Sequence, residues 1–264
     1  MNKNKDSAPE KKYIVHSLER GLEILELLSE RPDEWALNEI AQTLGFSSAN
    51  THKLLRALKA NGFVMQNPEN SKYRVSLKLF MLSSSLIRGF DIISESRPIM
   101  KILANKTNTV ACLTVRNGDN CLCIEHAEGS THVPIIFLRR GVHLPLYIGA
   151  AALVLLAYLP SEEKDRILSA GPLKPWTPAT ITDVDTINDN LQQIRDKKYY
   201  ICRDGVTMGI SAIAMPIHDW SNKVIGALSI AGLSQDFEEE YIQEKLAFLR
   251  DAVVELSNNV GPSH

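Results

Sequence analysis

The chain has 264 residues, of which 44% are hydrophobic, and a formal net charge of −2 at pH 7. That length allows one large or two modest domains with packed cores, and the nearly neutral charge excludes a protein that coats nucleic acid with its whole surface. The sequence contains no apolar run of the ~18 residues that a membrane-spanning helix needs, and its first twelve residues, MNKNKDSAPEKK, contain no hydrophobic signal segment. We therefore expect a cytoplasmic protein without a membrane partner.

The first helical pattern follows a polar beginning. Residues 1–12 are charged and polar and predict a mobile arm. From His16 to Ser29 leucines recur at helical spacing, which predicts a helix. We expect this helix to turn four leucines toward a core, namely Leu18, Leu22, Leu25 and Leu28.

A helix-turn-helix pattern comes next. Leu37–Leu44 is a short amphipathic segment, and Gly45 after it can adopt the positive φ of a tight turn. The following helix has an apolar face and a basic face, and no acidic residue occurs from Ala41 to Pro68. Cations without neighbouring carboxylates are suited to DNA phosphates, so this is the candidate recognition helix. Its apolar face holds Thr51, Leu54, Leu55 and Leu58, and its polar face holds Ser48, His52, Lys53, Arg56 and Lys59.

Two β-like runs, Phe63–Gln66 and Tyr73–Val75, follow with a turn-rich segment between them. A hairpin directly after a recognition helix is a wing, whose Lys72 and Arg74 could reach a phosphate or the minor groove. Residues 13–75 therefore predict a winged helix-turn-helix DNA-binding domain. We expect the cations to bind phosphates, and Ser48, Asn50 and His52 to face base edges. The full predicted contact set is Ser47, Ser48, Asn50, Thr51, His52, Lys53, Arg56, Lys72 and Arg74.

The rest of the chain predicts a linker helix and an α+β domain. Residues 76–97 keep a helical pattern, and Pro98 should end this helix or start the next one. In residues 98–264, strand hairpins split by helices indicate an antiparallel sheet. We expect strands at Val110–Arg116, Cys121–His126, Val133–Leu138, Tyr199–Cys202, Ser211–His218 and Val224–Ala231, and helices at Pro98–Asn105, Ile148–Leu159, Glu162–Leu168, Asp183–Lys197 and Asp236–Asn259.

The four cysteines do not form a recognisable metal motif. Cys121 and Cys123 lie on one face of a predicted strand, and no second closely spaced Cys/His pair of the usual zinc type accompanies them. Small buried hydrophobes in a reducing compartment are the favoured interpretation. A metal or redox role for the pair is left open.

Catalysis is the rival class of function. Cys202 with His218 and Asp219 is the most tempting set. His218 and Asp219 are adjacent in the sequence, however, and adjacent residues cannot orient one another as the members of a triad do. The run Gly209–Ile213 lacks the second glycine of a nucleophile elbow, and the sequence contains no phosphate-binding loop. We therefore predict no catalytic residues, no cofactor and no metal.

Several blocks in order resemble the IclR family of transcriptional regulators, over nearly the whole chain from about Tyr13. They are Val15–Leu25, the helix-turn-helix, Tyr73–Leu77, Leu144–Ala151, Gly209–Ile217 and Gly226–Gly232. The resemblance implies a GAF-like effector-binding and oligomerisation domain, a homodimer that assembles into a homotetramer, and a pseudo-palindromic double-stranded operator. The family often has Pro, Arg and Ser where this chain has Ser47, Ser48 and Ala49, so the operator sequence is expected to differ.

The resemblance also implies an effector cavity. Exposed N–H groups at a helix start near Gly149 suit a carboxylate, although small residues there could instead serve only close helix–sheet packing. Ala212 stands where many relatives have cysteine and Leu153 where they often have lysine, so we expect an apolar cavity. Carried over, the effector-binding residues are Gly149, Ala150, Ala151, Ile210, Ala212 and Ser229, with Asp204 in place of a family acidic residue.

Together these patterns predict a ligand-responsive DNA-binding regulator, either repressor or activator, that senses a small organic acid with an apolar or aromatic body. The alternative is a metabolite-sensing interaction module whose winged helix binds protein instead of DNA. A steep salt dependence of duplex binding distinguishes the two.

Overall fold

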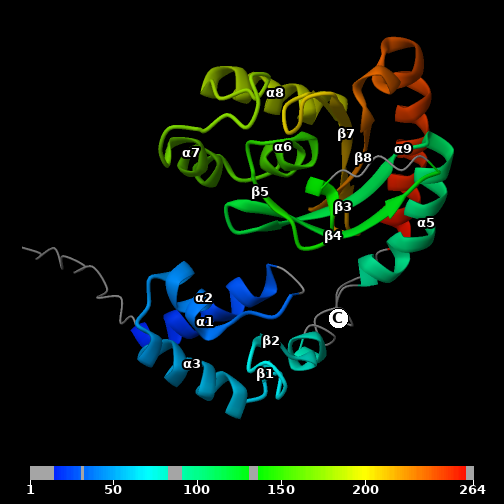
Figure 1. Cartoon of the computed structure of the whole chain (residues 1–264). Helices are drawn as coiled ribbons and strands as arrows, with labels where there is room; N and C mark the ends of the chain where they lie inside the picture. Colours follow the sequence, from blue (N-terminus) through cyan, green and yellow to red (C-terminus); the bar gives the residue numbers. More distant parts are fainter. Residues whose placement is uncertain (1–14, 31–32, 83–90, 131–135, 260–264) are drawn as a thin grey trace, which may run out of the picture. The chain divides into compact units, whose positions relative to one another are not determined.

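The computed structural model describes residues 15–30, 33–82, 91–130 and 136–259 (Figure 1). The chain divides into two compact units, residues 1–88 and 89–264. The predicted arm at residues 1–12 lies outside the described residues. The α+β fold class is confirmed, with a helix-turn-helix in the first unit and an antiparallel sheet in the second. No helix in the described part of the chain is long and apolar enough to cross a membrane.

The N-terminal unit is a small three-helix domain with a two-stranded wing. Its elements are α1 (His16–Ser29), α2 (Leu37–Leu44), α3 (Ser48–Ala60), β1 (Val64–Gln66) and β2 (Tyr73–Val75), and the two strands pair antiparallel. The core that joins them consists of Ile24, Leu27, Leu28, Trp35, Ile40, Leu55, Val64 and Tyr73.

Helix α1 has the predicted bounds but not the predicted buried face. Ile24 and Leu28 are buried, whereas Leu18 is 62% and Leu22 is 50% exposed. The prediction that Leu18 and Leu22 face the core is therefore wrong. The helix has apolar residues on two faces, and only the one that includes Gly21 and Ile24 contacts α3 and the wing.

The turn between α2 and α3 is fixed by backbone geometry and one side chain. Gly45 has φ +68, a left-handed conformation that ends α2, and the N–H of Phe46 donates to the carbonyl of Ala41 at 2.8 Å. Ser47 then caps α3, because its Oγ accepts from the N–H of Asn50 at 3.3 Å. These contacts set the angle at which α3 leaves the turn.

The prediction for Pro98 is wrong. Of the predicted linker helix, residues 77–82 are helical and residues 83–90 lie outside the described residues. The next helix, α5, runs from Asp91 to Thr107 and contains Pro98 in its interior. A proline in a helix removes one backbone hydrogen bond. The side chains that follow it, including Ile99, Met100 and Leu103, are buried against the sheet, and their burial outweighs that loss.

The C-terminal unit is a six-stranded antiparallel sheet covered on both faces. Helices α5 and α9 (Glu239–Asn259) cover one face, and α6 (Ala150–Ala157) and α8 (Val184–Lys197) cover the other, with α7 (Ser161–Ser169) beside α6 (Figure 1). The strand order is β5-β4-β3-β8-β7-β6, in which β3 is Val110–Asn117, β4 Asn120–Glu128, β5 His143–Pro145, β6 Tyr200–Arg203, β7 Ile210–His218 and β8 Val224–Leu233.

One predicted strand does not form in the described part of the chain. Of the expected strand Val133–Leu138, residues 133–135 lie outside the described residues and Ile136–Leu138 form a short 3-10 helix, η1. The edge of β4 is paired instead by β5, where Cys121 lies opposite Leu144. The prediction of a strand is therefore wrong for residues 136–138, which form η1.

The two faces of the sheet differ in side-chain size. On β7, Ile213 and Met215 pack toward α5 and α9, whereas Ala214 packs toward α6. On β8, Leu228 packs toward α5 and α9 and Ala227 toward α6. Small side chains on the α6 face leave space between the sheet and that helix, and this space positions the cavity described next.

Candidate DNA-binding surface and effector cavity

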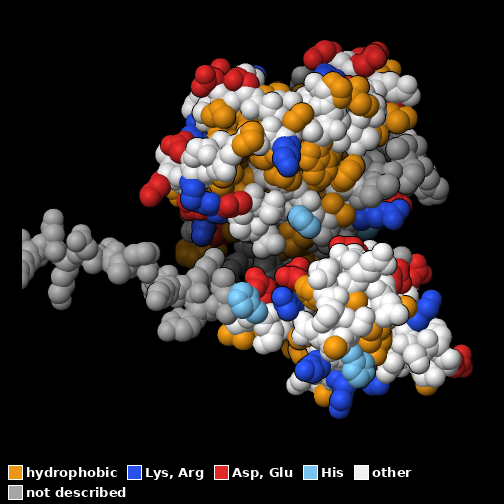
Figure 2. Space-filling model, turned by 60° about the vertical axis from the view of Figure 1, so that its left-hand side comes forward, with side chains coloured by type: hydrophobic (Ala, Val, Ile, Leu, Met, Phe, Trp, Pro, Cys, Tyr) orange, Lys and Arg blue, Asp and Glu red, His pale blue; other side chains and the backbone are white. Residues whose placement is uncertain are grey.

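Helix α3 has the two faces that its sequence predicts. Thr51 and Leu55 are buried, and His52, Lys53 and Arg56 are exposed. Figure 2 shows Lys, Arg and His side chains gathered at the lower edge of the N-terminal unit. Lys59 extends this basic face, and its Nζ donates to Gln66 of the wing at 2.9 Å. This hydrogen bond joins the basic face of α3 to the wing.

Two of the predicted DNA contacts are changed by the structure. Thr51 has no exposed surface and its hydroxyl donates to the carbonyl of Ser47 at 3.1 Å, so it cannot contact a base and leaves the predicted set. Ser47 and Ser48 are exposed and Asn50 is partly exposed at the start of α3. Ser47 also caps the helix, so it has a structural role whether or not it touches DNA.

The wing binds a carboxylate that sequence reasoning missed. Glu34 accepts hydrogen bonds from Asn70 at 2.8 Å and from Asn67 at 3.0 Å, and its Oε1 lies 3.9 Å from Nε of Arg74. The hydrogen bonds from Asn70 and Asn67 hold the pKa of Glu34 below its ordinary value, so it stays charged. Arg74 is thereby partly neutralised, although both cations of the predicted wing pair, Lys72 and Arg74, are exposed.

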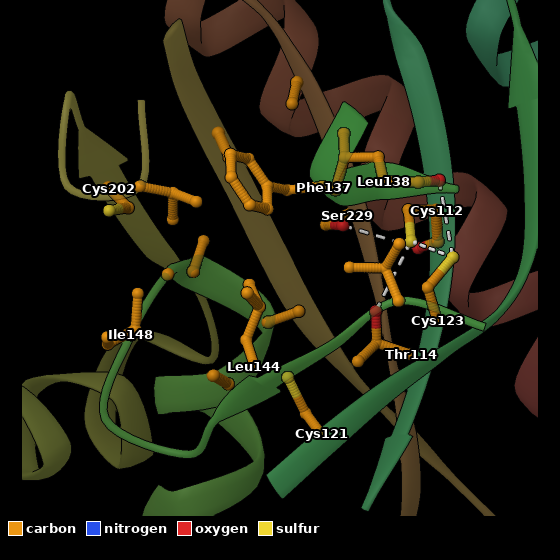
Figure 3. A pocket seen from close by; sticks show the side chains of 18 of the residues that line it. Cys112, Thr114, Cys121, Cys123, Phe137, Leu138, Leu144, Ile148, Cys202 and Ser229 are labelled. Atoms are coloured by element: carbon orange, nitrogen blue, oxygen red, sulfur yellow. Dashed lines mark hydrogen bonds between the residues drawn. The ribbon is translucent and has the colours of Figure 1, made fainter. Parts of the chain in front are cut away.

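A cavity lies between the sheet and the start of α6 (Figure 3). Its empty volume is about 640 Å³, counting the solvent at its mouth. Six of the predicted effector-binding residues line it, which are Gly149, Ala150, Ala151, Ile210, Ala212 and Ser229.

Asp204 is the predicted effector residue that does not line the cavity. Its Oδ1 accepts from the N–H of Gly209 and from Oγ of Ser234, both at 2.8 Å. These bonds turn the carboxylate toward the β6–β7 connection. Asp204 therefore leaves the predicted effector set, because local backbone and hydroxyl donors already bind it.

The cavity wall is apolar and uncharged. The side chains lining it include Phe137, Leu138 and Leu144, and among the described lining residues there is no Asp, Glu, Lys, Arg or His. Helix α6 begins at the cavity without a side-chain cap after Gly149, whose φ is +94. The N–H groups of a first helical turn lack intrahelical partners, so they can bind an acceptor there.

All four cysteines line this cavity, and the sequence pattern showed only that Cys121 and Cys123 share a strand face. Cys112 and Cys123 are buried on neighbouring strands with their Sγ atoms 3.0 Å apart (Figure 3). Burial raises the pKa of Cys121 to about 12 and that of Cys202 to about 11. Within the described ranges, no group of three or more His, Cys, Asp or Glu residues could hold a metal ion.

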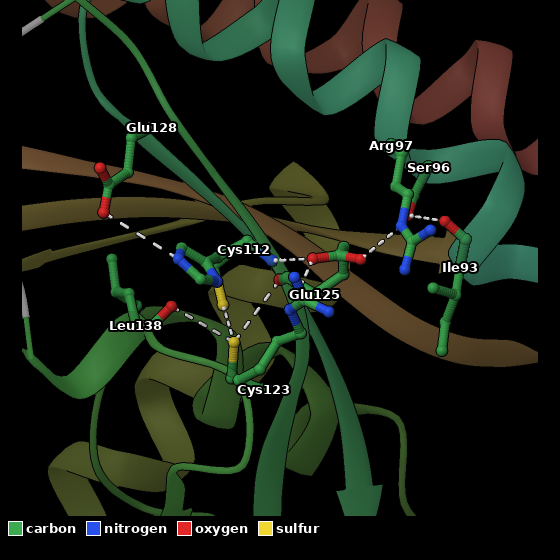
Figure 4. Close-up of polar contacts among 10 residues, drawn as sticks. Ile93, Ser96, Arg97, Cys112, Cys123, Glu125, Glu128 and Leu138 are labelled. Carbon is green, nitrogen blue, oxygen red and sulfur yellow. Dashed lines mark hydrogen bonds and ion pairs between the residues drawn. The ribbon is translucent and has the colours of Figure 1, made fainter. Parts of the chain in front are cut away.

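Beside the cavity, a buried carboxylate connects three segments. Glu125 on β4 is 3% exposed, and its two oxygens meet Nε of Arg97 on α5 at 2.7 Å and Nε of Arg140 at 3.0 Å (Figure 4). The N–H of His126 also donates to it at 3.0 Å. No sequence motif signals this arrangement, because the three segments meet only in the fold.

A winged helix-turn-helix unit joined to a sheet domain with an apolar cavity defines a transcriptional regulator controlled by a small ligand. Family models agree with that class. The IclR helix-turn-helix domain matches residues 17–68, and the bacterial transcriptional regulator IclR C-terminal domain matches residues 84–258. The chain belongs to the IclR family.

Known proteins similar to this chain are regulators. The HTH-type transcriptional regulator XynR of Escherichia coli is 29% identical over 248 residues, which cover 94% of this chain and 98% of XynR. The HTH-type transcriptional repressor AllR of the same species is 28% identical over 247 residues, which cover 94% of this chain and 91% of AllR. An IclR regulator from Alicyclobacillus acidocaldarius has a similar crystal structure, with a TM-score of 0.80 at 27% identity, and the match covers 94% of this chain and all of that one.

A second solved structure shows the same fold at lower identity. An IclR homolog from Microbacterium hydrocarbonoxydans, crystallised with 4-hydroxybenzoate, has a TM-score of 0.81 at 21% identity, with 92% of this chain and 98% of that chain covered. Family membership confirms that the chain is a DNA-binding transcriptional regulator and not an enzyme. It also favours DNA over protein as the partner of the winged helix.

Proposed function

We propose that the chain is a cytoplasmic, dimeric regulator that binds a pseudo-palindromic operator through α3 and the wing, and that a small organic acid with an apolar or aromatic body controls this binding. The observation that carries the proposal is the uncharged cavity at the uncapped start of α6. An acid ligand would place its carboxylate on the first-turn N–H groups and its body among the apolar side chains.

The DNA side of the proposal rests on the exposed face of α3. Lys53 and Arg56 point away from the buried face that holds Leu55, and their exposed charges are available to an anionic partner. We assign them, with Lys72, to phosphates. Ser48, Asn50 and His52 lie nearer the start of α3 and are assigned to base edges, since the beginning of a recognition helix enters the major groove.

A salt-varied mobility shift with the upstream intergenic DNA and a scrambled duplex tests this assignment. Arg56→Ala should weaken binding to all sequences and lower the slope of log K against log salt by roughly 1, the value for one lost phosphate contact. Asn50→Ala should change sequence preference and leave the slope intact. Lys197→Ala, an exposed cation on α8, is the matched control. Equal effects of the first two variants on every duplex would refute the division of roles.

The acid side of the proposal rests on the small residues around Ala151. Because Ala150 and Ala151 line the cavity beside Gly149, the backbone of the first turn is accessible from it. The Microbacterium relative was crystallised with an aromatic acid, 4-hydroxybenzoate, which is the ligand class expected here.

Thermal-shift titration with benzoate, benzamide and a sugar acid tests the ligand class. We expect benzoate to stabilise the protein most, because benzamide lacks the charge and a sugar acid brings hydroxyls into an apolar wall. Ala151→Trp should abolish the shift by filling the cavity, and Ala170→Trp on the exposed end of α7 should retain it. Tight binding of the sugar acid that Ala151→Trp abolishes would refute the apolar ligand while keeping the cavity as the site.

The dimer rests on apolar residues that the N-terminal unit leaves uncovered. Val15, which precedes α1, is 62% exposed, Leu18 and Leu22 of α1 are 62% and 50% exposed, and Leu77 is 78% exposed. Such residues are suited to pairing with a second copy. Sedimentation of wild type and Leu18→Glu tests this, with a shift toward monomer expected for the variant; the same experiment shows whether dimers assemble into tetramers.

A further inference from the structure

Two thiols within the effector cavity are close enough to react with one another. Cys112 Sγ lies 3.0 Å from Cys123 Sγ, and both residues line the cavity. Cys123 pairs with Thr114, two residues along β3 from Cys112, so the two cysteines are diagonal neighbours across the strands. A disulfide requires about 2.05 Å between sulfurs, so only a small approach separates the pair from a bond.

The local structure gives the strands some freedom for that approach. The β3–β4 register shifts between Leu113 and Thr114, directly beside Cys112. A register irregularity interrupts the regular ladder and bends the strand locally. The strands at this point are therefore less constrained than in a regular pair.

The two thiols are chemically different from one another. The contact with the Cys123 sulfur lowers the pKa of Cys112, against the opposing effect of its burial, whereas the same contact raises the pKa of Cys123. This difference in pKa agrees with Cys112 as the nucleophile and Cys123 as the thiol that resolves its oxidised form, and the 3.0 Å between the two sulfurs allows that second step. A cysteine that forms thiolate beside a resolving cysteine is the arrangement of a redox-sensitive pair.

We propose that Cys112 and Cys123 form an oxidation site for organic hydroperoxides that enter the effector cavity. The Cys112 thiolate attacks the distal peroxide oxygen, the O–O bond breaks, and the products are a sulfenic acid on Cys112 and, after protonation, an alcohol. The Cys123 sulfur then attacks the Cys112 sulfur, and the sulfenic oxygen leaves as water. The two thiols are oxidised to a disulfide and the peroxide is reduced by two electrons.

The cavity wall gives this site its selectivity and its consequence. An apolar wall that includes Phe137 and Leu144 favours a hydroperoxide with a hydrocarbon body over hydrogen peroxide. The thiol of Cys123 also donates to the carbonyl of Leu138 at 3.4 Å, and disulfide formation removes that hydrogen. Oxidation would thus alter the cavity wall at Leu138. Any effect of this change on DNA binding rests on the proposed function.

Peptide mapping of the full-length protein after treatment with cumene hydroperoxide tests the site. Trypsin separates Cys112, in residues 107–116, from Cys121 and Cys123, in residues 117–139, and from Cys202, in residues 199–203. We expect the first two peptides to become linked with loss of two hydrogen atoms. The link should persist in Cys121→Ala and Cys202→Ala and disappear in Cys112→Ala and Cys123→Ala. Hydrogen peroxide at equal concentration should form the link at about one tenth of the rate of cumene hydroperoxide or more slowly still. This difference is expected because the cumyl ring loses water contact in the cavity.

Three outcomes would overturn the inference. These are a bond between Cys121 and Cys123, irreversible oxidation without a link, or equal rates with both peroxides. Mapping of the wild-type protein detects the first two outcomes even if a variant does not fold. A mobility shift on the reduced protein keeps the tests separate, since DNA binding without a link refutes only the oxidation site, and a link without DNA binding refutes only the proposed function.

Discussion

Replacing Arg97 should destabilise the C-terminal unit more than neutralising the carboxylate that it binds. Glu125 is 3% exposed, whereas Arg97 and Arg140 are each 57% exposed. Removing Arg97 therefore leaves a buried charge with one arginine and one backbone N–H. Glu125→Gln instead removes the charge that burial penalises, and the two arginines can return to water.

The magnitude follows from the hydrogen bond that is lost. A bond to a charged group contributes about 1.5–3 kcal/mol, so Arg97→Met should cost roughly 2 kcal/mol. In a domain of this size that corresponds to a Tm lower by roughly 4–8 °C. Glu125→Gln should cost less, because the amide can still accept the N–H of His126 and carries no charge.

Thermal unfolding of Arg97→Met, Glu125→Gln and the double variant tests this expectation. The double variant should be more stable than Arg97→Met alone, because the buried carboxylate that lost one of its two arginines is gone. Lys101→Met is the matched control. Lys101 lies on the same helix and donates to the carbonyl of Glu128 at an exposed position, so its loss should change stability by less than about 0.5 kcal/mol. Additive losses in the double variant would refute the reasoning.

Three further variants test single features. Gly149→Ala should lower stability by about 1–3 kcal/mol in urea unfolding, because its φ of +94 suits glycine and the new Cβ would lie 3.0 Å from Val206; an unchanged midpoint would contradict the strain. Burial and, to a smaller extent, the charge of Lys198 lower the pKa of His218. The unfolded chain therefore takes up this proton first, so stability should be unaffected above about pH 6.5 and fall as the pH drops below it. His218→Gln should flatten this fall in Tm, and an identical pH profile would exclude His218 as its source. Ser47→Ala should cost about 1 kcal/mol through loss of the α3 cap, whereas Ser47→Asp should keep the cap and weaken DNA binding by repulsion; equal stability of all three proteins would contradict the capping role.

Local sequence patterns predicted the elements well where one periodicity decides. The apolar spacing of α3 indicated its buried and basic faces, because this helix has one apolar face and that face packs on the core. The same reasoning failed at Leu18 because α1 has two apolar faces, and periodicity does not say which one is covered. It failed at Pro98 because tertiary burial of Met100 and its neighbours overrides the intrinsic preference of proline.

Local pattern alone could predict the cavity only on the side that one continuous segment forms. Gly149–Ala151 could be identified from its run of small residues, and the family resemblance supplied Ile210 and Ser229. Cys112 and Phe137 were missed because their place depends on strand order and on β5 pairing with β4. Asp204 was wrongly included since nothing in the sequence shows that Ser234 and the N–H of Gly209 bind it.

Strand β4 connects the cavity with the helix that begins the C-terminal unit. Cys123 contacts the cavity wall at Leu138, and two positions later Glu125 binds Arg97 of α5. A contact of this kind can be purely structural or can transmit ligand binding, and its position alone does not decide between them. The Arg97→Met variant separates the two, because coupling is the ratio of DNA affinities with and without ligand. If both affinities change in parallel the contact only stabilises the fold, whereas a changed ratio shows that Glu125 transmits the state of the cavity.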